Sequence, residues 1–95
     1  YVKMPQLCGG RFPDIDNFKD RWDIIIVDGD YRDECAQYAL PTLKPGAYLI
    51  LDNYKQETVW PDWPLTEELI KGMPLMLFVE VGHWDSWTTA VIQKP

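Results

Sequence analysis

The sequence predicts an α/β fold in which a helix connects two parallel strands, and a second helix and an antiparallel pair of strands follow. Two short apolar runs, residues 24–27 and 47–51, flank a segment with helical periodicity. A strand, a helix and a strand within about 30 residues match the length and order of a βαβ unit with a right-handed crossover. Two later apolar segments, 75–81 and 88–94, are joined by GHWDSW, which suits an antiparallel return.

The first strand, Asp23 to Asp28, contains four consecutive branched apolar residues, Ile24 to Val27, and ends in the sequence DGD. An unbroken apolar run favours a strand that is buried on both faces, as in a parallel sheet. In open α/β sheets the carboxyl ends of the strands face the crevice where ligands bind, so Asp28 and Asp30 are candidate site residues. A second interpretation stays open, because Asp-Gly is common turn chemistry and Asp30 would also suit the cap of the following helix.

The first helix covers residues 31–40, where apolar side chains recur at helical spacing. The side chains expected on its buried face are Cys35, Ala36, Ala39 and Leu40. Those expected in solvent are Arg32, Asp33, Glu34 and Gln37. Pro41 should end or bend this helix, because proline lacks a backbone donor and clashes with the preceding turn.

The second strand, residues 47–51, follows the turn LKPG and ends in Asp52 and Asn53. Parallel neighbouring strands bring their carboxyl ends to the same edge, so these two residues should lie near Asp28 and Asp30. Carboxylates packed together repel one another, and a hard cation such as Mg²⁺, which prefers oxygen ligands, would relieve this. Asp28, Asp52 and Asn53 could hold it while Asp30 points at a substrate or cofactor; alternatively, all four are solvated turn residues.

The remaining segments are a loop, a helix and an irregular start. Residues 54–63 form a polar and aromatic loop whose length is typical of functional or partner-binding loops. The second helix begins near Pro64, whose fixed φ suits a first turn, and ends near Gly72. Residues 1–21, with glycines and prolines among scattered acids, should be irregular apart from a short strand at 1–4.

One histidine and four loop tryptophans are further candidates for a site. An unperturbed histidine changes charge near neutrality, so His83 is a candidate general base, although lone loop histidines are more often surface residues. The tryptophans of the two long loops could form an aromatic wall over a ligand or pack the loops together. They are Trp60, Trp63, Trp84 and Trp87.

Composition excludes several classes of protein. With 46% hydrophobic and 25% charged residues, the chain is expected to be globular. A net charge of −6 argues against nucleic acid and anionic membranes as partners. No apolar run approaches the roughly 20 residues needed to span a bilayer. Cys8 and Cys35 lack metal-ligand spacing, so we expect reduced thiols in a cytoplasmic protein, although a disulfide stays open.

The segment WDIIIVDGDYRDECAQYALPTLKPGAYLILDN resembles the second half of the class I S-adenosylmethionine-dependent methyltransferase fold, which has a Rossmann-like sheet. VDGD, LKPG and LDN at their mutual spacing carry this resemblance, and it extends over residues 22–95. It implies that the last strand inserts antiparallel beside the fifth strand of that sheet, here residues 47–51. The implied function is transfer of a methyl group to a small-molecule acceptor.

Within that family, the strand-end motifs are similar to those of the metal-dependent O-methyltransferases of catechols and caffeoyl coenzyme A. The similarity implies a divalent cation at Asp28, Asp52 and Asn53, and a reactive centre at Asp28 and Asp30. The residues implied to contact S-adenosylmethionine are Asp28, Gly29, Asp30 and Tyr31.

The sequence departs from the family pattern in three respects. Tyr31 stands where many of those enzymes have a lysine that assists deprotonation, and Ala47 replaces the second glycine of LKPGG. The glycine-rich loop and the acid that hold the cofactor have no counterpart in the 95 residues. We therefore expect residues 1–95 to be a single partial domain, the C-terminal part of a longer enzyme, whose sheet is completed by a missing half or by a second copy. The alternative is a non-catalytic α/β module for binding or assembly.

Overall fold

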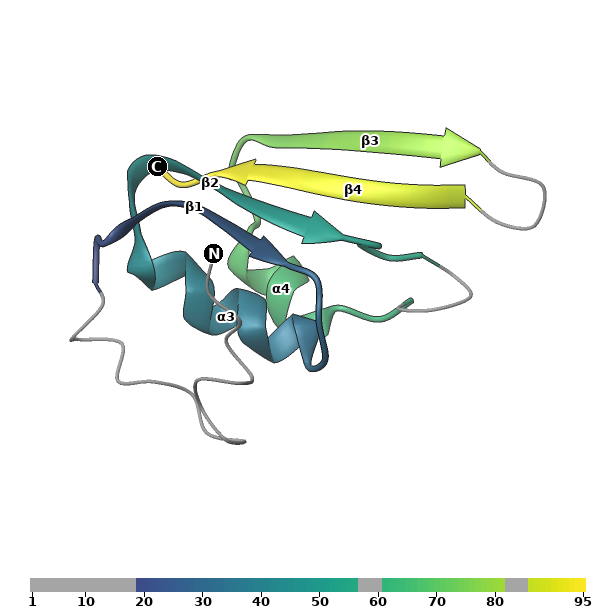
Figure 1. Ribbon diagram of the computed structural model, residues 1–95, viewed down its shortest axis with the longest axis horizontal. Coiled ribbons are helices and arrows are strands. Elements are labelled where there is room, and N and C mark those ends of the chain that lie inside the picture. Colours follow the sequence, from purple (N-terminus) through teal and green to yellow (C-terminus); the bar gives the residue numbers. More distant parts are fainter. Residues whose placement is uncertain (1–18, 57–60, 82–85) are drawn as a thin grey trace.

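The strands among the described residues form one mixed sheet, and the described helices lie together on one of its faces (Figure 1). The strands are β1 (Trp22–Val27), β2 (Leu43–Asp52), β3 (Leu75–Val81) and β4 (Ser86–Gln93). The computed structural model describes residues 19–56, 61–81 and 86–95, and their sheet has the order β1-β2-β4-β3. β1 and β2 are parallel, whereas β4 is antiparallel to both β2 and β3. The prediction of an α/β fold with a parallel pair and an antiparallel pair is confirmed.

The parallel pair aligns the apolar runs of its two strands. Residues 24–27 of β1 lie opposite residues 48–51 of β2. Trp22 pairs with Leu43, so LKPG is an irregularity inside β2 and not, as predicted, a turn that precedes it. Gly46, at φ +81°, takes the left-handed conformation that this irregularity needs and that a residue with a Cβ adopts only at a cost.

The helix that connects the parallel strands is α3, Arg32–Thr42. It contains Pro41 but continues for one residue beyond it, where the Leu43 backbone N–H donates to the Leu40 carbonyl. The four side chains expected on the buried face are all buried. The prediction for Arg32 is wrong, because its side chain is only 6% exposed.

The second helix, α4, spans Pro64–Leu69, with its proline in the first turn as predicted. Its amino-terminal N–H groups are capped by a residue of the other helix. The Asp33 carboxylate accepts from the Leu65 N–H at 3.1 Å and from the Thr66 N–H at 2.7 Å. The Thr66 hydroxyl also donates to that carboxylate, at 2.7 Å. Asp33 therefore fastens α4 to α3 and does not, as predicted, lie free in solvent.

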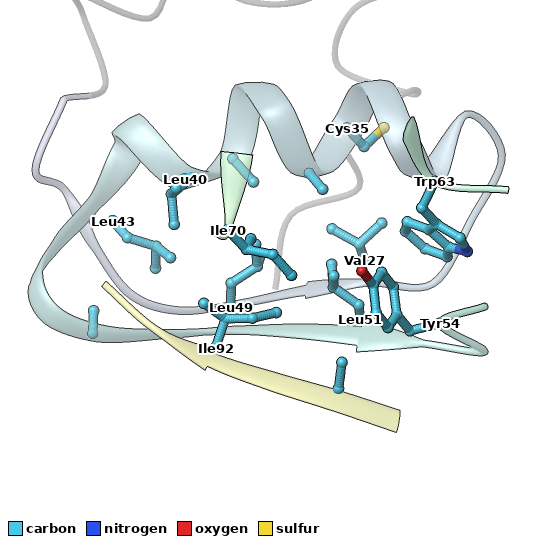
Figure 2. Close-up of a cluster of buried hydrophobic side chains, with 14 residues drawn as sticks. Val27, Cys35, Leu40, Leu43, Leu49, Leu51, Tyr54, Trp63, Ile70 and Ile92 are labelled. Atoms are coloured by element: carbon cyan, nitrogen blue, oxygen red, sulfur yellow. The ribbon is translucent and has the colours of Figure 1, made fainter. Parts of the chain in front are cut away.

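The hydrophobic core lies between the sheet and the two helices (Figure 2). Leu49 and Leu51 of β2 and Ile92 of β4 are fully buried there. Trp63 is 1% exposed, and its ring meets that of Tyr54 edge-on with centroids 5.2 Å apart. Burying one such large side chain stabilises the fold by about 1.5–3 kcal/mol, so this one-sided core holds the helices to the sheet.

The face of the sheet opposite α3 and α4 is apolar but exposed; we call it the open face. Ile26, Ile50, Val91 and Met76 form one cross-strand row through all four strands. The prediction that β1 is buried on both faces is wrong for the described part of the chain, since Ile24 and Ile26 are about half exposed. Side chains alternate along a strand, and within residues 19–56, 61–81 and 86–95 both helices cover the other face.

Candidate functional site

The carboxyl ends of β1 and β2 meet at one edge of the sheet, as the sequence predicts. Val27 and Leu51 are opposite each other in the parallel register, so Asp28 comes just after β1 beside the end of β2 at Asp52. Asn53 follows with φ +56°, a left-handed value that asparagine adopts more readily than most residues. We call Asp28, Asp52 and Asn53 the strand-end cluster.

A buried arginine lies within the strand-end cluster. Arg32 Nη1 donates to the Asp52 carbonyl oxygen at 2.6 Å and to Asn53 Oδ1 at 2.9 Å. Its Nε donates to the Gly29 carbonyl oxygen at 2.9 Å, and its Nη2 lies 3.6 Å from Asp28 Oδ1. One guanidinium therefore joins the residues that follow β1 to those at the end of β2.

Further hydrogen bonds fix the orientation of Asn53. Its Nδ2 donates to Gln56 Oε1 at 2.5 Å, while the Gln56 backbone N–H donates to the Asn53 carbonyl at 3.2 Å. The Asn53 backbone N–H donates to Asp52 Oδ1 at 3.1 Å. Because the amide oxygen of Asn53 faces Arg32 and its nitrogen faces the buried Gln56, both ends of this side chain are engaged within the protein.

The strand-end cluster does not fit a divalent cation in this arrangement. Asn53 Oδ1 accepts from the guanidinium and Asp28 Oδ1 lies beside it. A guanidinium is always charged, and a second cation among the same oxygens would be repelled by it. Among the described residues, no group of three or more His, Cys, Asp or Glu could hold a metal ion. Arg32 supplies the positive charge for which the sequence suggested Mg²⁺.

The loop of residues 28–31 forms the exposed part of the site. The side chain of Asp28 is 51% exposed, Asp30 is exposed, and Tyr31 is 68% exposed. Tyr31 occupies the N-cap position of α3 and makes no side-chain cap hydrogen bond, so Asp30 is not the cap residue of this helix. Tyr31 has φ +57°, which costs about 1–2 kcal/mol for a residue with a side chain. Strain of this kind is concentrated at functional sites.

Two exposed carboxylates beside an aromatic ring define what this loop can do chemically. Ionised Asp28 and Asp30 can only accept hydrogen bonds, so they suit ligands that carry hydroxyl or amine donors. The negative charge of Asp30 and the ring of Tyr31 both favour a cationic group. A Cβ on Gly29 would meet no atom of the described residues within 4 Å, so these residues leave the space beside the loop open.

A buried tyrosine adjoins the strand-end cluster. Burial raises the pKa of the Tyr54 phenol above its ordinary value near 10, and the negative charge of Asp33 raises that pKa further. Tyr54 packs on Trp63 in the core, as Figure 2 shows. It is therefore a neutral, structural phenol near physiological pH.

The other residues that the sequence suggested for a site do not lie together in the described part of the chain. Trp63 packs in the core, whereas Trp87 on β4 is about half exposed, so these two rings do not form one wall. Cys35 is buried, and its thiol donates to the Asp30 carbonyl oxygen at 3.6 Å. Cys8, His83, Trp60, Trp84 and the short strand expected at 1–4 lie outside the described residues.

Sequence reasoning missed Arg32 and Gln56. A signal for Arg32 was present, because it lies three and four residues before Cys35 and Ala36 and therefore on the same stripe of the helix. Extending that apolar stripe by one turn would have placed the guanidinium under the strand ends. Gln56 has no comparable signal, since it follows the sheet in an irregular segment.

Comparison of this chain with protein-family models, with curated proteins and with solved structures found no match. None of the helices among the described residues is long and apolar enough to cross a membrane.

Proposed function

We propose that this chain is the C-terminal part of an S-adenosylmethionine-dependent methyltransferase with a Rossmann-like sheet, which acts on a small molecule. The observation that carries the proposal is the strand order β1-β2-β4-β3. Strands that are consecutive in sequence usually lie side by side, which would place β3 against β2. Instead β4 inserts between them, antiparallel to both, as the resemblance to the class I methyltransferase fold implies.

In this proposal the loop of residues 28–31 contacts the cofactor. S-adenosylmethionine, when bound, supplies an electrophilic methyl group on a positively charged sulfonium. Asp30 places an exposed negative charge at the edge where the parallel strands end, and opposite charge favours the binding of a cation. Tyr31 offers an exposed ring, and the open space at Gly29 lets a ligand approach the backbone closely.

The two carboxylates have different surroundings, and we assign them different roles. Asp28 is held beside Arg32, which suits a residue that orients the ligand. Asp30 is exposed on the loop and suits proton transfer. Methylation of a hydroxyl or an amine requires the acceptor to lose a proton, and the Asp30 carboxylate would take it. No step passes through a metal ion, because the strand-end cluster is engaged by Arg32.

A non-catalytic assembly module is the second candidate, and the open face favours it. A contiguous apolar surface on one side of a sheet is characteristic of an interaction site. Residues 75–79 of the edge strand β3 are also between 45% and 60% exposed, and an apolar edge is prone to pair with another strand. In both candidates we propose that further chain covers this surface, either the remainder of a longer protein or a second copy.

Binding of S-adenosylmethionine separates the two candidates. The measurement is isothermal titration calorimetry with S-adenosylmethionine, on the full natural polypeptide in which residues 1–95 occur. We expect Asp30→Asn to weaken binding by about tenfold, the loss of one favourable charge, and to slow methyl transfer by about 10²–10⁴-fold. Glu34→Gln, which neutralises an exposed carboxylate on α3, is the matched control and should change neither. A polypeptide that binds no S-adenosylmethionine would favour the assembly module.

A further inference from the structure

We propose that the Arg32 guanidinium is the resident cation of the strand-end cluster, where it locks the ends of β1 and β2 together and excludes divalent metal ions. Arg32 would carry this charge and connect the two strand ends whichever reaction or partner the site serves. The tests below can therefore refute the role of Arg32 without refuting the proposed methyl transfer, and the reverse.

The geometry of the contacts argues for a lock. The acceptors lie on both sides of the parallel pair: the Gly29 carbonyl follows β1, and the Asp52 carbonyl and the Asn53 amide oxygen belong to the end of β2. Nε donates to the acceptor that follows β1, and Nη1 of the same planar group donates to both acceptors of β2. A guanidinium offers its donors in a fixed fork, whereas an ammonium is a single point with rotating donors, so lysine cannot reproduce these contacts at once.

The burial of Arg32 argues for exclusion of metal ions. Its side chain is 6% exposed, and a buried charge is tolerated only when it is paired and hydrogen-bonded. No buried side-chain nitrogen or oxygen in the part of the chain that the structure describes lacks a hydrogen-bond partner. For a metal ion to bind at the predicted ligands, Asn53 Oδ1 would have to exchange its guanidinium donor for the ion, and Asp28 Oδ1 would hold the ion beside the guanidinium, which lies 3.6 Å away. Mg²⁺ also sheds its water reluctantly, so it is a weak competitor for this position.

The first experiment uses the unaltered chain. Mn²⁺ is titrated while the amide signals of Asp28 and Asn53 are followed by NMR, and thermal unfolding is recorded with millimolar Mg²⁺ and with chelator. We expect no selective paramagnetic broadening of the two signals, and the same Tm in both solutions. Selective broadening that Asp28→Asn abolishes, or a Tm that rises with Mg²⁺, would overturn the exclusion.

The second experiment replaces Arg32. Arg32→Lys keeps the charge but not the fork, and Arg32→Met keeps the length of the stem but not the charge. Both should lower Tm by roughly 10 °C or more, since the part-buried acceptors at Gly29, Asp52 and Asn53 lose their hydrogen-bond partner. Arg21→Met is the control, because Arg21 is exposed and lies at the other end of β1. There its Cζ is 5.2 Å from the centroid of the Trp22 ring.

The outcomes of the two experiments are separable. If Arg32→Lys has the Tm of the unaltered chain, the fork is unnecessary and the lock is refuted. If Arg32→Met does not fold while Arg21→Met does, the lock is supported, and the metal titration of the unaltered chain still decides the exclusion by itself. We further expect Arg32→Lys to remain insensitive to Mg²⁺, because it retains a positive charge at the cluster.

Discussion

Replacing Asp33 with alanine should destabilise the domain by about 2–3 kcal/mol, although the sequence places this residue on a solvent-exposed helix face. Loss of the helix cap at Leu65 and Thr66 costs about 1 kcal/mol. The Thr66 hydroxyl is fully buried, and a buried donor left without its partner costs about 1–3 kcal/mol. The lower half of that range applies, because this hydroxyl also lies 3.4 Å from the Asp33 carbonyl oxygen, which the substitution leaves in place.

The assay is urea unfolding followed by tryptophan fluorescence, in which buried Trp63, the residue just before α4, reports the loss of this helix. For a domain of this size the expected loss corresponds to a fall in Tm of roughly 10–20 °C. Glu34→Ala, the next residue along α3 and exposed, is the control and should change stability by no more than about 0.5 kcal/mol.

A double-mutant cycle with Thr66→Val tests whether the effect comes from this contact. Residues joined by a hydrogen bond show coupling energies of about 0.5–3 kcal/mol, so the two substitutions should not be additive. Additive effects, or an Asp33→Ala variant as stable as Glu34→Ala, would refute the conclusion that Asp33 fastens α4 to α3.

Three further predictions concern the core and its surroundings. The pKa of Tyr54 in the folded chain is raised above the unfolded value near 10. The neutral phenol therefore contributes its full stabilisation below pH about 10, and this contribution is lost as the pH rises through the folded pKa. Tyr54→Phe should reduce the loss of stability at alkaline pH, as measured by urea unfolding at a series of pH values. Leu49→Ala at a fully buried position should cost about 2–5 kcal/mol in the same assay, clearly more than Tyr48→Ala on the open face. Lys94 Nζ donates to carbonyl groups at and just after the end of α3. Lys94→Met should therefore lower the free energy of unfolding by about 1–2 kcal/mol, as measured by thermal unfolding. Lys44→Met breaks only an exposed ion pair and should lower it by less than about 1 kcal/mol.

The strand-end cluster was predictable from the sequence, but its chemistry was not. A parallel βαβ unit brings its carboxyl ends together by topology, so Asp28 and Asp52 had to share an edge once the two strands were recognised. Which cation balances the negative charges of Asp28 and Asp52 depends on the direction of one side chain of α3, that of Arg32. That direction is fixed by the packing of α3 on the sheet, which turns Arg32 inward.

The same distinction applies to the two faces of β1. Four consecutive apolar residues predict burial on both sides, and the helices supply it for Val27. Ile24 and Ile26 stay about half exposed, since both described helices pack on the opposite face. A pattern of residues shows that a face is apolar, but it does not show what covers it.

The sequence by itself determined the features that neighbouring residues decide: the strands and helices, the crossover between β1 and β2, and the bounds of β3. Periodicity and turn chemistry act over a few residues, so they can be interpreted locally. Only the tertiary structure decided the cap that Asp33 provides for α4 and the contacts of Arg32 with the end of β2. Each of these joins groups about 20 or more residues apart, and contacts at such separations form only when the whole domain folds and offsets the entropy of closing the chain between them.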